Sequence, residues 1–128
     1  MPLSSLNVEN PVVRLCIQGT QAEFTRDLEK AKQLYREAWD LAQDDFEACV
    51  AAHYVARFQE NPQDRLRWNT IALKKGQAVG VERVQSFFPS LYLNMGQSYE
   101  LLGNLANAKR YYDLAADLVI IHRNTNAK

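Results

Sequence analysis

Residues 91–115 read LYLNMGQSYELLGNLANAKRYYDLA. Gly103 and Asn104 divide this stretch into two helical segments, because both residues favour turns. Gly96 and Ala108 are small residues at positions where the two helices would touch, and the large Tyr112 falls where they would leave a gap. The spacing predicts two short helices packed closely against each other.

A second copy of the pattern lies 77 residues earlier in the chain. The positions that match Leu105, Ala108, Tyr111, Tyr112, Ala115 and Ala116 are Leu28, Ala31, Leu34, Tyr35, Ala38 and Trp39. A distance of 77 residues is one 34-residue repeat plus a repeat lengthened by nine, so a middle copy is expected, with Ala72 34 residues after Ala38. The middle copy fits in two registers, which place either His53 or Ala52 at the position of Gly96.

The third copy resembles a tetratricopeptide repeat. The residues that carry this resemblance are Tyr92, Met95, Gly96, Tyr99, Ala108, Tyr112 and Ala115, whereas Ile120 stands where the family usually has proline. The long third repeat is similar to longer-repeat variants in bacterial multi-helix regulators and adaptors. The resemblance implies an all-α fold, an α-α superhelix of three helix-turn-helix pairs. We expect a single domain over 1–128, with repeats at 11–42, 45–79 and 82–122 and a tail at 123–128.

The local signals give the expected helices. Asn61 can cap a helix that starts at Pro62, and turns are expected at Gly19-Thr20 and Gly103-Asn104. The predicted ranges are 11–22, 25–42, 45–59, 62–79, 82–102 and 105–122. Pro89 either bends the fifth helix or starts it, with 81–88 as a separate turn.

Composition narrows the classes of partner. Fifteen basic residues balance fifteen acidic ones, so we do not expect nucleic acid as a partner, although Arg65, Arg67, Lys74 and Lys75 crowd around Trp68. No stretch is apolar for long enough to span a membrane, and the start lacks a secretory pattern, so we expect no membrane association and a cytoplasmic location. Cys16 and Cys49 are expected to be free thiols.

The resemblance implies a non-catalytic protein-interaction module, a solenoid adaptor or scaffold. In this family the first helix of each pair lines a groove for a protein or peptide. By position, the expected groove residues are Thr20, Glu23, His53, Arg57, Asn94, Gln97 and Glu100. Ser90 and Asn94 stand where family members that bind chaperone tails have basic residues, so such tails are not expected here.

Two alternatives come from the residues themselves. The last helix has a wide apolar arc, which predicts a structural or regulatory homodimer. The expected dimer surface comprises Phe87, Phe88, Tyr111, Leu114, Leu118 and Ile121. Cys49 and His53, four residues apart with Cys16 nearby, would serve a small ligand sensor or enzyme. The sequence has no recognisable catalytic or phosphate-binding motif, so no enzyme, cofactor or metal is predicted.

Overall fold

The computed structural model of the protein describes residues 7–80 and 87–126, with side chains as far as residue 118. This part of the chain is helical and contains no strand. The helices are α1 (Pro11–Phe24), α2 (Leu28–Leu41), α3 (Asp45–Ala56), α4 (Pro62–Val79), α6 (Phe88–Leu101) and α7 (Leu105–Asn126). The expected all-α class is confirmed.

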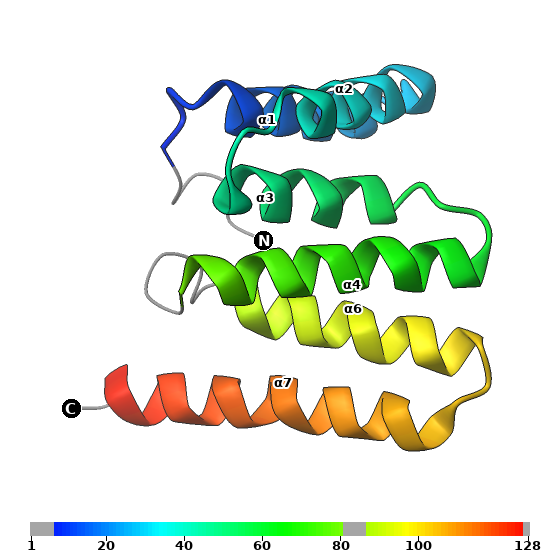
Figure 1. The fold of residues 1–128 in the computed structure, drawn as a ribbon, viewed down its shortest axis with the longest axis vertical. Helices are drawn as coiled ribbons and strands as arrows, with labels where there is room; N and C mark the ends of the chain where they lie inside the picture. The colour runs from blue at the N-terminus through cyan, green and yellow to red at the C-terminus, as the bar shows by residue number, and fades with distance from the viewer. Residues whose placement is uncertain (1–6, 81–86, 127–128) are drawn as a thin grey trace.

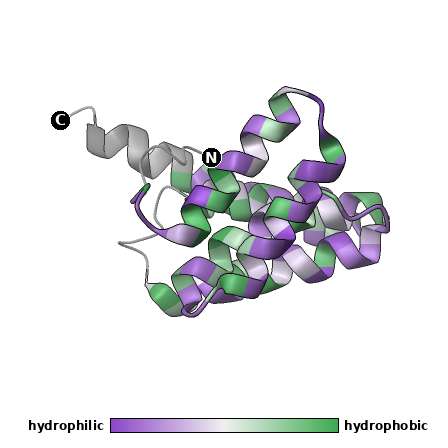
Figure 2. Ribbon diagram, turned by 90° about the horizontal axis from the view of Figure 1, so that it is seen from above, coloured by the Kyte–Doolittle hydropathy of each residue, from purple (hydrophilic) through white to green (hydrophobic). Residues whose placement is uncertain are grey.

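The helices form three hairpins that stack along the longest axis of the molecule (Figure 1). Within each pair, α1 packs on α2, α3 on α4, and α6 on α7, and the pairs meet through α1 and α2 against α3 and through α4 against α6. This is the stacked arrangement expected of a tetratricopeptide-like solenoid. Figure 2, which looks down the stack, shows apolar and hydrophilic residues alternating along the helices, the pattern by which amphipathic helices bury one side.

Helix α3 lies at the centre of the stack. Ten of its 12 residues are buried, because it packs on the first pair on one side and on α4 on the other. Its burial on several sides explains why its sequence, DFEACVAAHYVA, has almost no polar face.

The N-caps of the second helices fix the register of the repeats. The side chains of Asp27, Asn61 and Asn104 each accept a hydrogen bond from a backbone N–H in the first turn of the helix that follows. These caps are 34 and 43 residues apart, so His53, rather than Ala52, corresponds to Gly96. Of the additional nine residues, four lengthen α4, which has 18 residues against 14 in α2. The other five lie in the connection between the second and third pairs, which includes residues 81–86, outside the described residues.

The predicted break at Gly19-Thr20 is wrong, since α1 continues to Phe24. Gly19 is a packing residue: a Cβ atom there would lie 2.4 Å from Cε1 of Tyr35. Helix α2 starts at Leu28, because the preceding residues form the turn in which Arg26 has a φ of 63°.

The other boundaries differ by a few residues. Helix α3 ends at Ala56 and α7 continues to Asn126, against predicted ends at 59 and 122. Helix α4 spans Pro62–Val79 as predicted. Helix α6 starts at Phe88, next to Pro89, which fits a helix that begins at this proline better than one that begins at 82.

Candidate functional site

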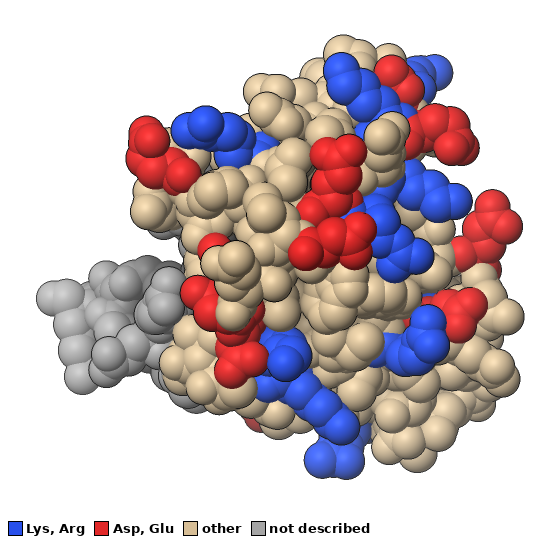
Figure 3. Space-filling view, turned by 45° about the horizontal axis from the view of Figure 1, so that its top comes forward, with Lys and Arg blue, Asp and Glu red and all other residues tan. Residues whose placement is uncertain are grey.

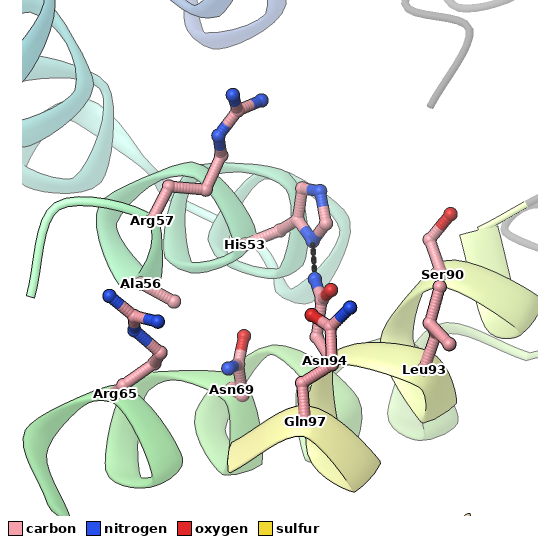
Figure 4. Close-up of a pocket in the computed structure, with 9 residues that line it drawn as sticks. All are labelled: His53, Ala56, Arg57, Arg65, Asn69, Ser90, Leu93, Asn94 and Gln97. Carbon is pink, nitrogen blue, oxygen red and sulfur yellow. Dashed lines mark hydrogen bonds between the residues drawn. The ribbon is translucent and has the colours of Figure 1, made fainter. Parts of the chain in front are cut away.

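Helices α3, α4 and α6 surround a polar hollow of about 370 Å³ between the second and third pairs (Figure 4). We call it the middle hollow. Its lining residues are His53, Ala56, Arg57, Arg65, Asn69, Ser90, Leu93, Asn94 and Gln97.

Helical spacing brings these side chains together. His53 and Arg57 are four residues apart on α3, Arg65 and Asn69 are four apart on α4, and α6 adds two more such pairs, so each helix presents one face to the hollow. In Figure 4, Arg65 and Asn69 of α4 lie along one side of the hollow, while His53 of α3 meets Asn94 of α6 directly.

The middle hollow exists because the second pair lacks a tyrosine that the other pairs have. In the first and third pairs, the ring of Tyr35 lies against Gly19 and that of Tyr112 lies against Gly96. The register places His53 at the glycine position and Asn69 at the tyrosine position of the second pair. Asparagine is much smaller than tyrosine, and polar groups therefore line space that an aromatic ring fills elsewhere.

The hydrogen bonds of the hollow leave two polar atoms without a partner. His53 Nδ1 and Asn94 Nδ2 are 3.2 Å apart. Asn69 Nδ2 donates to Ser98 Oγ at 2.9 Å, and Arg65 Nη2 donates to the backbone oxygen of Gln59 at 3.0 Å. Among the described residues, Asn69 Oδ1 and Arg65 Nε are buried and have no protein partner. A buried polar group without a partner is costly, so both atoms favour a polar guest or a bound water.

A carboxylate of the first pair, Glu23, partly neutralises the positive charge of the hollow. Arg57 Nη2 donates to Glu23 Oε1 at 2.9 Å, which joins α3 to α1. Burial, and then the neighbouring Arg57, lowers the pKa of His53 to about 4, so the imidazole is neutral at pH 7. With Asn94 Nδ2 as the donor, neutral His53 accepts at Nδ1 and carries its proton on Nε2.

The structure brings four of the seven predicted groove residues to the hollow, namely His53, Arg57, Asn94 and Gln97. Glu23 is linked to the lining residues by its hydrogen bond with Arg57, and it also accepts a hydrogen bond from the Tyr35 hydroxyl. Glu23, Thr20 and Glu100 lie outside the lining. Thr20 Oγ1 donates to the Cys16 carbonyl at 3.0 Å, and Glu100 Oε2 accepts from the Tyr112 hydroxyl at 2.5 Å.

Sequence reasoning missed Arg65 and Asn69, which come from the second helix of a pair and so lie outside the expected groove. The signal was present as a departure from the pattern, since they stand where the repeat has alanine and tyrosine. A polar residue at a position that normally packs is a sign of a local gap in the core.

The thiols are not part of the hollow. Cys16 and Cys49 are free and buried, and burial raises the pKa of each to about 12, so both are protonated, weakly nucleophilic thiols at neutral pH. Among the described side chains, no group of three or more His, Cys, Asp or Glu residues is placed to hold a metal.

Charged side chains of both signs are interspersed on the face shown in Figure 3. This mixture is unlike the basic stripe that tracks a phosphate backbone. Within the part of the chain that the structure describes, no helix has the length and apolarity to cross a bilayer.

The predicted dimer surface is only partly accessible. Phe87 and Phe88 are 0 % and 6 % exposed and belong to the core cluster, in which Phe88 lies beside Gly76 of α4. Tyr111 and Leu118 are half-buried against the core, and Tyr111 stacks on Tyr99 with ring centroids 5.7 Å apart. Leu114 is half-buried. The side chain of Ile121 lies outside the described residues.

A comparison with protein-family models matches residues 89–118 to the tetratricopeptide repeat. The match spans α6 and most of α7, the same hairpin in which Gly96 accommodates Tyr112. Neither the curated proteins nor the solved structures contain a match to this chain. The matched hairpin, the two further stacked hairpins and the common N-cap register together make the protein a tetratricopeptide-like helical-repeat protein.

Proposed function

We propose that this protein is a non-catalytic interaction module that holds a segment of another polypeptide along α1, α3 and α6, with the middle hollow as its main anchor. Tetratricopeptide repeats generally mediate contacts between proteins, and the hairpin that matches this repeat supports the same class of function for this chain. The observation that supports the site is the convergence of His53, Arg57, Asn94 and Gln97 from two helices on one hollow.

The chemistry of the hollow favours an uncharged polar anchor. Among the residues that the structure describes, Arg65 Nε and Asn69 Oδ1 are buried in the wall of the hollow without a protein partner. A guest that meets both after a shift of these side chains must accept from one and donate to the other, as a peptide group or a side-chain carboxamide does. A carboxylate offers acceptors alone and would face the oxygen of Asn69. We therefore expect an asparagine or glutamine, or an exposed turn of backbone, at the anchored position of the bound segment.

The helical frame is formed before the partner arrives, so little ordering cost falls on the receptor. Affinity then depends on a few anchors rather than on the total area of contact. We place the protein in a reducing compartment, the cytoplasm, in keeping with its two free buried thiols.

Selection from a random peptide library displayed on phage, with the intact chain as bait, tests this proposal. We expect selected peptides to bind with micromolar Kd and to be enriched in Asn or Gln at one position. Gln97 is exposed at the rim of the hollow, so Gln97→Ala should weaken binding at least tenfold without affecting the fold.

The matched control is Gln33→Ala, which changes an exposed glutamine on the outer helix α2 and should leave binding unchanged. Circular dichroism of both variants verifies the helical content. The proposal fails when no peptide is selected, or when the two variants lower the affinity for the selected peptides equally.

A homodimer through the last helix has less support than a peptide groove. Phe87 and Phe88 are buried in the chain itself, and Tyr111 and Leu118 pack partly on its own core. Sedimentation velocity at high protein concentration distinguishes the two. A homodimer predicts a sedimentation coefficient that rises with protein concentration as monomers associate, whereas a peptide groove predicts a monomer throughout.

A further inference from the structure

The open end of the third pair is an uncovered copy of a surface that α3 covers in the first pair. Gly19, Glu23 and Tyr35 in the first pair correspond to Gly96, Glu100 and Tyr112 in the third, each 77 residues later. In both pairs the tyrosine ring lies against the glycine and its hydroxyl donates to the glutamate. We call this arrangement the Gly–Glu–Tyr triad.

In the first pair, α3 covers the triad with two specific contacts. The ring of Tyr54 stacks on that of Tyr35, with centroids 5.0 Å apart and planes at 23°. Arg57 Nη2 pairs with Glu23 Oε1 at 2.9 Å. As a result Tyr35 is 1 % exposed and Cys16, on the same side of α1, is fully buried.

In the third pair the same positions face outward. Leu93, which corresponds to Cys16, is 44 % exposed and also borders the middle hollow. Tyr112 is partly exposed and Glu100 is exposed. Helix α7 is the last described helix of the stack (Figure 1). Among the described residues, the third pair therefore presents the acceptor and the aromatic surface of the first pair, and no helix covers them as α3 covers the first pair.

The second pair serves as an internal control. It lacks the triad, having His53, Arg57 and Asn69 at the three positions. The helix that covers it, α6, has Gln97 and Glu100 at the positions of Tyr54 and Arg57. Of the two pairs that a following helix covers, the first has both the triad and the tyrosine–arginine helix, and the second has neither.

We infer that the face formed by Leu93, Glu100 and Tyr112 binds an α-helix of another protein, one that carries an aromatic residue and, three positions later, an arginine. The aromatic ring would stack on Tyr112 and the guanidinium would pair with Glu100, as Tyr54 and Arg57 do on the first pair. A second copy of this chain is a poor occupant. Tyr54 and Arg57 are the one such pair in the sequence, and they are already engaged within α3.

A peptide with the sequence of residues 44–59, acetylated and amidated at its ends, is a suitable probe because it carries Tyr54 and Arg57 in their native spacing. We expect its addition to the ¹⁵N-labelled chain to shift the backbone amide signals of Gly96, Glu100 and Tyr112. Glu100→Arg should weaken binding at least tenfold, and a peptide with Arg57→Glu should restore most of that loss on the Glu100→Arg protein.

The control variant is Glu37→Arg, an equal charge reversal at an exposed position on α2, which should bind the peptide as the unmodified chain does. The inference is overturned by absence of shifts at millimolar peptide, or by equal losses in the two variants. Failure of the charge exchange to restore binding also overturns it. So do shifts confined to α1 and α2, which would mean that the peptide replaces α3, and self-association through Glu100, which would make a second copy the occupant.

Discussion

Two glycines in this protein hold a tyrosine ring directly against a helix backbone. A Cβ atom at Gly19 would lie 2.4 Å from Tyr35 Cε1, and one at Gly96 would lie 2.6 Å from Tyr112 Cε1. Tyr35 is buried beneath Tyr54 and cannot move aside, whereas Tyr112 is partly exposed. We predict that Gly19→Ala lowers the free energy of unfolding by about 2 kcal/mol, because crowding exceeds the gain in helix propensity.

Gly96→Ala is the matched comparison. Its cost should be under about 1 kcal/mol, because the ring of Tyr112 can turn into solvent. Urea titrations followed by circular dichroism measure both variants. A larger loss for Gly96→Ala than for Gly19→Ala would contradict the packing described here.

Arg26 and Gly103 are the same residue of the same turn, with positive φ angles of 63° and 78°. Each donates to the backbone three residues earlier, and the next residue donates five residues back, which is the Schellman pattern. Arginine is strained at positive φ and glycine is not. We predict that Arg26→Gly raises the free energy of unfolding by about 0.5 to 1 kcal/mol, measured by urea denaturation.

The reverse change supplies the control for this turn. Gly103→Ala places a side chain at positive φ and should lower the free energy of unfolding by about 1 kcal/mol. Space is not the cause, since a Cβ at Gly103 meets no atom within 4 Å. A loss of stability in Arg26→Gly would contradict the backbone strain that we assign to Arg26.

Helix ends also connect one pair to the next. Asn10 Oδ1 accepts from the backbone N–H of Val12 at 2.9 Å, and Asn10 Nδ2 donates to Glu47 Oε2 on α3 at 2.9 Å. We predict that Asn10→Ala lowers the free energy of unfolding by about 1.5 to 2 kcal/mol, since a cap and a contact between pairs are lost together.

Asn61 gives the comparison, because its side chain caps α4 by accepting from the backbone N–H of Gln63 at 2.8 Å. Asn61→Ala should cost about 1 kcal/mol, as for a cap alone. Asn10→Asp keeps the cap but places a carboxylate beside Glu47, and should fall between the other two variants. Thermal unfolding of the three variants tests the order, and equal losses would show that the contact to Glu47 contributes nothing.

Elements with strong local signals were predictable from the sequence. Asn61 and Pro62 fix the start of α4, and Val79 before Gly80 fixes its end, so its bounds agree with the structure. Gly19 misled the prediction because a glycine that marks a turn and a glycine that admits a ring look alike in sequence. Only the three-dimensional contact with Tyr35 separates them.

The candidate site was predictable from the sequence only in part. His53, Arg57, Asn94 and Gln97 follow from the groove position of the resembled family, although the sequence left two registers open for the middle copy. The hollow itself depends on a missing ring at Asn69, and its size is a matter of how neighbouring pairs pack. A pattern match records such a residue as a poor fit and does not show that it leaves an open space.

At the scale of the whole molecule, stability should depend on pH through His53. Burial, followed by the nearby Arg57, lowers its pKa from 6.5 to about 4. The unfolded chain therefore binds a proton between these values when the folded chain does not, and the free energy of unfolding falls as the pH is lowered from 6.5 towards 4. The full loss is about 3 kcal/mol. Urea midpoints measured across this range should show it.

His53→Gln is the control for this pH dependence. The variant should show a flatter profile between pH 6.5 and pH 4.5, because no imidazole in α3 remains to be protonated. His122 is present in both proteins and cancels in the comparison. Parallel profiles for the two proteins would mean that His53 titrates normally.

The central burial of α3 has a consequence for how the molecule opens. Its neighbours shield it on both sides, whereas α2 and α7 each have one side towards solvent, so thermal fraying should begin at the two ends and reach the middle last. Amide hydrogen exchange should accordingly be slowest in α3 at neutral pH. At acid pH the order should reverse, because protonation of His53 destabilises α3. The helix that is most protected at neutral pH is then the one where acid unfolding starts.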